Sequence, residues 1–147
     1  MKILVPIDGS RHSLESLKIA AHFAKTAGAK AFMIHITPSV SDIDLELSPS
    51  DRDRLLESLK KRGEEILRKG ADSLLSAGAK DVSSVLTTAD STAHEIVAYA
   101  EREKIDLIVI GSKGTGASPR FLLGGTASRV VRHSPCCVYV VKEPCWA

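Results

Sequence analysis

Asp106–Arg129 has the sequence DLIVIGSKGTGASPRFLLGGTASR, a short apolar strand followed by a glycine-rich loop and the start of a helix. Five of the ten glycines in the chain lie between Gly111 and Gly125. Because glycine has no Cβ atom, the N–H groups of such a loop can approach a ligand closely. A helix that begins around Thr126 adds N–H groups without intrahelical acceptors and a partial positive charge. This strand–loop–helix unit therefore predicts a phosphate site for a nucleotide.

Four more apolar segments alternate with helical patterns in the rest of the chain. Continuous runs of β-favouring residues are typical of strands that are covered on both faces. The expected strands are Ile3–Ile7, Ala31–Ile36, Val82–Leu86, Leu107–Ile110 and Cys136–Val141. The first expected helix opens at Ser13 and stops at Gly28, and the second opens at the N-cap Ser48 and stops near Ala77. The third opens with a capping box at Thr92 and runs to about Glu103, and the fourth runs from about Gly125 to His133.

Strict alternation of strands and helices predicts an α/β fold with an open, five-stranded parallel sheet and helices on both faces. Two strand orders fit, 3-2-1-4-5 and 2-1-3-4-5, and ligands bind where the order reverses. The first order places Asp8, at the end of strand 1, beside the loop that begins at Gly111. The second pairs strand 1 with strand 3, whose exit at Thr87–Asp90 has fewer ligand-like groups. We therefore expect the order 3-2-1-4-5.

Length and charge limit the classes of protein that fit. A chain of 147 residues is expected to form one domain over residues 1–147. Its net charge of +2 is too small to indicate binding to nucleic acid or to an anionic membrane. Runs such as Leu107–Ile110 are too short to span a membrane. The N-terminus reaches Pro6 and Asp8 too early for a signal peptide, so we expect a cytoplasmic location.

The side chains predict neither a catalytic site nor a metal site made by the protein alone. The five histidines are scattered, and the three cysteines, Cys136, Cys137 and Cys145, lack the spacing of metal ligands. We expect these cysteines to be reduced, and His35 to be a hydrogen-bonded core residue. Asp8, Ser10 and His12 are the residue types of a nucleophilic triad, but residues two apart on one turn rarely converge in the required relay.

Two common types of phosphate-binding loop are excluded, each because one residue that its motif requires is missing here. A Walker loop has lysine directly after its second glycine, and Ala117 follows Gly116 here. A dinucleotide fingerprint that starts at Gly114 has its third glycine where this chain has Pro119. The pattern that remains is Gly111, two residues, Gly114, nine residues and Gly124.

This pattern, with Gly-Ser-Lys-Gly at 111–114 and Phe-Leu-Leu-Gly at 121–124, resembles the nucleotide loop of the universal stress protein family. The strand exit at Val5–Ser13 and the ending at Ser134–Val141 look like the same family. The resemblance implies a Rossmann-like sheet of order 3-2-1-4-5, of the adenine nucleotide alpha hydrolase type. It also implies homodimers that pair through the last strand, Cys136–Val141, and ATP (or ADP or AMP) bound with Mg²⁺ or Mn²⁺.

The resemblance also implies roles for individual residues. Asp8 would face the base and ribose together with the backbone of Pro6 and Ile7, and Ile36 would line the adenine slot. The expected contacts along the loop are Ile110, Gly111 and Gly114 near the ribose and phosphates, and the N–H groups of Gly124, Gly125 and Thr126 around the phosphate tail. Apart from the resemblance, the loop cations Lys113 and Arg120 are candidate phosphate contacts, because their charges would screen those of the phosphates.

One position departs from the family. ATP-binding members usually have serine or threonine directly after the third glycine, where this chain has Gly125, and the lost hydroxyl bond is worth about 1 kcal/mol, or more when its acceptor is a charged phosphate. We expect a regulatory protein whose ATP occupancy changes its surface for a protein partner. The alternatives are slow ATP hydrolysis or self-phosphorylation, with acceptors at Ser112, Thr115 or Ser118, and a module of the same fold that binds no nucleotide.

Overall fold

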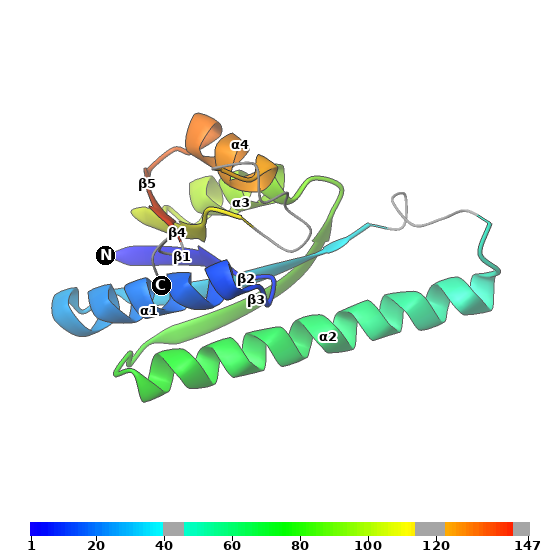
Figure 1. Ribbon diagram of the computed structural model, residues 1–147, viewed down its shortest axis with the longest axis horizontal. Helices are drawn as coiled ribbons and strands as arrows, with labels where there is room; N and C mark the ends of the chain where they lie inside the picture. Colours follow the sequence, from blue (N-terminus) through cyan, green and yellow to red (C-terminus); the bar gives the residue numbers. More distant parts are fainter. Residues whose placement is uncertain (40–45, 114–122, 143–147) are drawn as a thin grey trace.

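The computed structural model describes residues 1–39, 46–113 and 123–142. Strands and helices alternate along these residues, and the strands form one parallel sheet of order β3-β2-β1-β4-β5 (Figure 1). The elements are β1 (Lys2–Pro6), α1 (Arg11–Ala27), β2 (Lys30–Pro38), α2 (Pro49–Ser76), β3 (Val82–Ala89), α3 (Thr92–Arg102), β4 (Leu107–Gly111), α4 (Gly125–His133) and β5 (Cys137–Val141). The predicted order 3-2-1-4-5 is confirmed.

The sheet is buried on both faces by two separate hydrophobic cores. Ile3 and Val5 of β1 point into the core under α1 and α2, while Leu4 points into the core under α3 and α4. All three of these side chains are fully buried. Burial on both faces explains why the central strands β1, β2 and β4 are nearly continuous apolar runs, whereas the edge strands β3 and β5 have exposed positions such as Ser84 and Tyr139.

Serine side chains cap three of the helices, and two of these caps differ from the prediction. Ser48 caps α2 as expected, with its Oγ accepting the Asp51 N–H at 3.2 Å. Helix α1, however, begins at Arg11 after the cap Ser10, so the expectation of an opening at Ser13 is wrong. Helix α3 is capped by Ser91 rather than Thr92. In both cases the serine is extended, and the residue after it is already helical.

Strands β2 and β3 extend two and three residues further at the carboxyl end than predicted. They stay paired up to Pro38 and Ala89 because threonine side chains bridge the strands. The Thr37 hydroxyl lies 2.9 Å from the Thr88 hydroxyl and donates to the Thr87 carbonyl at 3.3 Å. At the other strand ends the differences are smaller: β1 ends at Pro6, and β5 begins at Cys137.

Two glycines let α2 lie very close to the sheet. A Cβ atom on Gly63 would lie 2.7 Å from Leu86 Cδ1 and 2.8 Å from His35 Cδ2. One on Gly70 would lie 2.9 Å from the sulfur of Met33. The sequence predicts a helix that is bent or tightly packed at these glycines, and the tight packing is confirmed. Figure 1 shows α2 running beside β2 and β3, with its N-terminal part extending past the end of β2.

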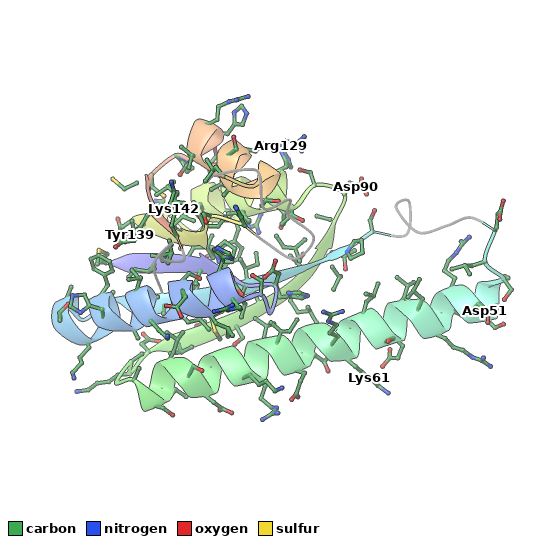
Figure 2. The ribbon with its side chains drawn as sticks, viewed as in Figure 1. Asp51, Lys61, Asp90, Arg129, Tyr139 and Lys142 are labelled. Carbon is green, nitrogen blue, oxygen red and sulfur yellow. The ribbon has the colours of Figure 1, made fainter. Side chains whose placement is uncertain are left out.

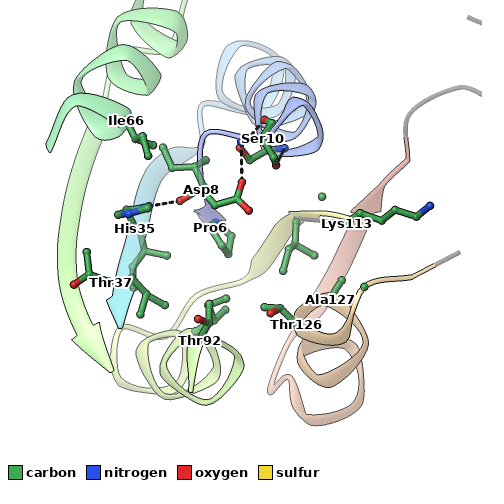
Figure 3. A pocket seen from close by; sticks show the side chains of 18 of the residues that line it. Pro6, Asp8, Ser10, His35, Thr37, Ile66, Thr92, Lys113, Thr126 and Ala127 are labelled. Carbon is green, nitrogen blue, oxygen red and sulfur yellow. Dashed lines mark hydrogen bonds between the residues drawn. The ribbon is translucent and has the colours of Figure 1, made fainter. Parts of the chain in front are cut away.

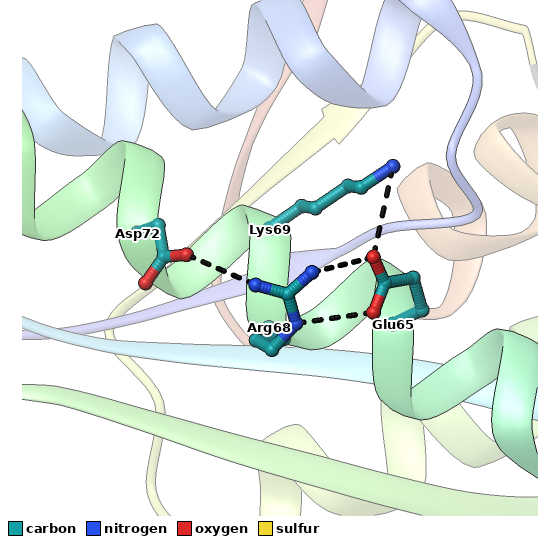
Figure 4. A network of polar contacts seen from close by, with 4 residues as sticks. All are labelled: Glu65, Arg68, Lys69 and Asp72. Atoms are coloured by element: carbon teal, nitrogen blue, oxygen red, sulfur yellow. Dashed lines mark hydrogen bonds and ion pairs between the residues drawn. The ribbon is translucent and has the colours of Figure 1, made fainter.

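The outer face of α2 carries charged side chains, Lys61 among them (Figure 2), and a network of ion pairs (Figure 4). Arg68 Nε donates to Glu65 at 3.0 Å, Arg68 Nη1 lies 3.6 Å from Asp72, and Lys69 lies 3.8 Å from Glu65. The hydrogen bond from Arg68 lowers the pKa of Glu65. All four side chains of the network are exposed, so these pairs contribute little to folding stability. Within the described ranges, no helix has the length and apolar character needed to cross a membrane.

Candidate functional site

A cavity of about 540 Å³ lies at the carboxyl ends of β1, β2 and β4 (Figure 3). Helices α1 and α2 contribute to its wall from one face of the sheet, and α3 and α4 contribute from the other. Its size falls within the range of small-molecule sites. Strand order reverses between β1 and β4, so the cavity occupies the position where open α/β sheets bind ligands.

Most of the predicted site residues line this one cavity. Their roles in nucleotide binding stay predictions. The lining residues among them are Pro6, Ile7, Asp8, Ile36, Ile110, Gly111, Lys113, Gly124, Gly125 and Thr126. Gly114 and Arg120 lie outside the described residues, as do Thr115, Ser118 and Cys145.

Asp8 sits at the exit of β1, and its carboxylate faces the cavity (Figure 3). One oxygen, Oδ1, accepts the Ser10 N–H at 2.9 Å. Gly9 between them has a φ of +85°, a conformation that favours glycine. Asp8 therefore shapes the turn into α1 and also presents a charged acceptor to the cavity.

The N-terminus of α4 opens on the cavity without a capping side chain. Its N-cap is Gly124, which is extended and makes no side-chain hydrogen bond, whereas α1, α2 and α3 each have a serine cap. The Gly124 N–H donates to the Ser112 carbonyl at 2.6 Å, so it is already used within the protein. Of the three N–H groups predicted to hold a phosphate, those of Gly125 and Thr126 remain in the first turn of the helix, where intrahelical acceptors are lacking.

Ser112 connects the end of β4 to its neighbours through its backbone. Its N–H donates to the Val141 carbonyl of β5 at 2.8 Å, and its own carbonyl accepts the Gly124 N–H. The residue is 2% exposed. Such burial argues against Ser112 as a phosphoryl acceptor, although the residue lines the cavity wall.

Gly111 is required by the packing of α1. A Cβ atom at this position would lie 2.7 Å from His12 Cβ, 2.8 Å from the His12 carbonyl carbon and 3.0 Å from the carbonyl oxygen. The first turn of α1 therefore rests directly on the end of β4. Gly125, in contrast, lies in open space among the described residues: apart from its chain neighbours and its own helix backbone, a Cβ atom there would meet none of their atoms within 4 Å, so a side chain fits.

His35 is hydrogen-bonded, as predicted, but it is only half-buried and lines the cavity rather than the core. Its Nδ1 lies 2.8 Å from the Ile7 carbonyl oxygen. Because a carbonyl can only accept, Nδ1 carries the proton in this bond. The bond fixes the ring next to Gly63 of α2.

Residues from the middle of α2 were missed by the sequence reasoning. Leu59, Arg62 and Ile66 recur at helical spacing and line the cavity. Thr92 and Ile96 of α3 line it as well. The rule that ligands bind at strand ends identifies loops but not helix faces. The sequence does contain a signal for these residues: the cation Arg62 falls within the apolar face of α2, where a charged side chain is unexpected.

Metal ligands are not grouped in the part of the chain that the structure describes. Within residues 1–39, 46–113 and 123–142, no three histidine, cysteine or acidic side chains lie close enough together to hold a metal ion. Cys136 is half-buried and Cys137 is exposed, and both are free thiols. The cavity therefore combines a helix N-terminus, a carboxylate and apolar walls.

Comparison with known proteins agrees with this architecture. The model of the universal stress protein family matches residues 1–142. Universal stress protein MJ0531 of Methanocaldococcus jannaschii is 37% identical over 143 residues, which cover 97% of this chain and 82% of that protein. The universal stress protein UspA from Lactobacillus plantarum is similar in structure, with a TM-score of 0.86, 27% identity, and 96% and 97% of the two chains covered.

A universal stress protein solved in complex with cAMP is also similar. Its TM-score is 0.75 at 26% identity, and the match covers 96% of each chain. The family match spans the residues that form the sheet and the cavity, from β1 through β5. This chain belongs to the universal stress protein family.

Proposed function

We propose that this protein binds adenine nucleotides, ATP among them, and acts as a regulatory protein whose surface depends on nucleotide occupancy. The observation that carries the proposal is the uncapped N-terminus of α4, which opens on the same cavity as the Asp8 carboxylate. A helix N-terminus favours phosphate, and a carboxylate favours ribose hydroxyls. The relative that was solved with cAMP supports an adenine nucleotide as the ligand class.

In the proposed mode, the phosphates lie at the N–H groups of Gly125 and Thr126, with Lys113 nearby on the cavity wall. The ribose lies over β1 at Asp8, and the base lies over β2 at Ile36. A divalent cation would arrive with the triphosphate, since the described residues hold no cluster of metal ligands. It would neutralise phosphate charge that the protein balances only in part.

Variants of Gly125 test the phosphate end directly, because the position is open to a side chain. Gly125→Ser is expected to tighten ATP binding about 10-fold, since its hydroxyl adds a charge-assisted hydrogen bond. Gly125→Pro is expected to weaken binding about 10-fold, since proline removes one N–H but suits the first helical position after an extended Gly124. Isothermal titration calorimetry with Mg-ATP measures both changes.

Gly125→Ala is the matched control. It fills the same space without adding or removing a donor, so its ATP affinity is expected to stay within about 2-fold of the wild type. Thermal melts of the variants without ligand should all match or exceed that of the wild type. A wild-type protein that binds neither ATP nor AMP would refute the proposed function. Equal affinities across the series would show that phosphate does not sit at α4.

We also propose that the protein forms a homodimer through β5. This strand lies at the edge of the sheet, where unpaired backbone groups can pair with a second copy. Tyr139 of β5 is 43% exposed and packs edge-on against Phe23 of α1, with ring centroids 6.3 Å apart. Light scattering at micromolar concentration is expected to give twice the monomer mass. A Tyr139→Lys variant is expected to shift the mass toward the monomer.

A further inference from the structure

Arg62 places a cation at the end of the cavity that lies away from α4. It lines the cavity from the middle of α2, one helical turn before Ile66. Figure 3 shows Ile66 and His35 on one side of the cavity, and Thr126 and Lys113 on the other. Strand order explains this separation, because β2 and β4 flank β1 on opposite sides. The cavity thus has a cationic residue at each end and the Asp8 carboxylate between them.

The position of Arg62 is held by close packing of the next residue. Gly63 lies so near the sheet that a Cβ atom there would come within 2.8 Å of both Leu86 and His35. The His35 ring is itself fixed by its bond to the Ile7 carbonyl. The α2 backbone at Arg62 therefore has a fixed distance from the carboxyl end of β2.

The Arg62 guanidinium has no carboxylate partner among the described residues. Arg68, on the same helix, is paired with both Glu65 and Asp72. Arg102 on α3 lies 3.8 Å from Glu95. The planar face of the Arg62 guanidinium is therefore available to a molecule in the cavity.

The spacing of the strands indicates which part of a nucleotide reaches Arg62. Neighbouring strands lie about 4.8 Å apart, so β2 and β4 are separated by about 10 Å. A nucleotide with its phosphate at α4 spans this distance and brings its base over β2. The walls there include the apolar side chains of Leu59, Ile66 and Ile36, which suit an aromatic ring, beside the polar side chains of His35 and Thr37. Phosphate groups would lie at the far end, beyond direct contact with Arg62.

We propose that Arg62 binds the base of the nucleotide by stacking its guanidinium on the purine ring. This inference rests on the proposed function. A guanidinium stacks on aromatic faces more readily than an ammonium group because it is planar and weakly hydrated. The interaction recognises the base rather than the phosphates, so it contributes equally to ATP, AMP and adenosine.

The test compares Arg62→Ala with Arg54→Ala, which removes the same charge from the same helix at a residue outside the cavity wall. Calorimetry measures the affinity for ATP and for AMP, and an NMR titration measures the affinity for adenosine. Arg62→Ala is expected to weaken all three about 3- to 10-fold. Arg54→Ala is expected to leave all three unchanged. Both variants should melt like the wild type, since both side chains are exposed.

Any other result of this test refutes either the stacking role of Arg62 or the proposed function. If the wild type binds but Arg62→Ala binds equally well, the stacking role is refuted and the proposed function stands. A loss confined to ATP and AMP, with adenosine unaffected, would mean that Arg62 contacts phosphate, which also refutes the stacking role. A wild type that binds none of the three ligands refutes the proposed function and this inference with it.

Discussion

Replacing Asp8 with alanine is expected to weaken ATP binding by about 10- to 100-fold. The carboxylate faces the cavity at the end of β1, where the proposed binding mode places the ribose. A hydrogen bond from a ribose hydroxyl to a charged acceptor is worth about 1.5–3 kcal/mol, which corresponds to this range. Calorimetry with ATP and with adenosine is expected to show the same factor for both ligands.

Asp8→Asn separates the ligand role from the turn role. The Asp8 carboxylate accepts the Ser10 N–H, so Asp8→Ala is also expected to cost about 1 kcal/mol, or roughly 2–4 °C in melting temperature. Asparagine keeps an oxygen for that bond, so the melting temperature of Asp8→Asn should match that of the wild type. Its affinity for ATP is expected to stay reduced, because the acceptor has lost its charge. Undiminished affinity in both variants would show that Asp8 serves only the turn.

Gly111→Ala is expected to lower the melting temperature by roughly 5–10 °C. The added methyl group meets the His12 backbone at 2.8 Å, and a backbone cannot rotate away as a side-chain tip can. Overpacking of this kind costs about 2–3 kcal/mol. Helix α1 must then move off β4, and because Ser10 caps its first turn, the Asp8 turn moves as well. A scanning calorimeter and an ATP titration record the two effects.

Gly125→Ala is the matched control for this variant, since it adds the same methyl group where no described residue outside its own helix turn lies within 4 Å. Its melting temperature is expected to equal or exceed that of the wild type, because alanine favours a helix over glycine. Gly111→Ala with an unchanged melting temperature would show that the contact between α1 and β4 adapts freely. The role of Gly111 would then lie in ligand approach rather than in packing.

The architecture could be predicted from the sequence because the central strands β1, β2 and β4 are buried on both faces and therefore appear as nearly uninterrupted apolar runs. The order of the strands was predicted from the positions of candidate ligand-binding residues rather than from secondary-structure propensities. Asp8 and Gly111 had to meet at one reversal, and of the two orders considered, 3-2-1-4-5 brings their strands together. The same reasoning placed most of the cavity wall, since a parallel sheet gathers its strand exits at one edge.

The rest depends on tertiary contacts that local patterns do not contain. Ser10 and Ser13 are both serines with suitable neighbours, and only the packed structure selects Ser10 as the cap. The hydrogen bonds from Thr37 to β3 lengthen both β2 and β3, although the residues at these strand ends have the sequence pattern of a turn. Arg62 reaches the cavity because Gly63 brings α2 against His35, a contact between segments far apart in sequence.

The backbone of Ser112 has a consequence for communication between the two copies of the proposed dimer. A single peptide segment links the α4 end of the cavity to the outermost strand, through one bond to Gly124 and one to Val141. A perturbation that enters at the start of α4 can thus travel to the rim of the sheet without disturbing either core. Linkage is reciprocal: whatever factor a bound nucleotide applies to association at that rim, association applies to the nucleotide in return.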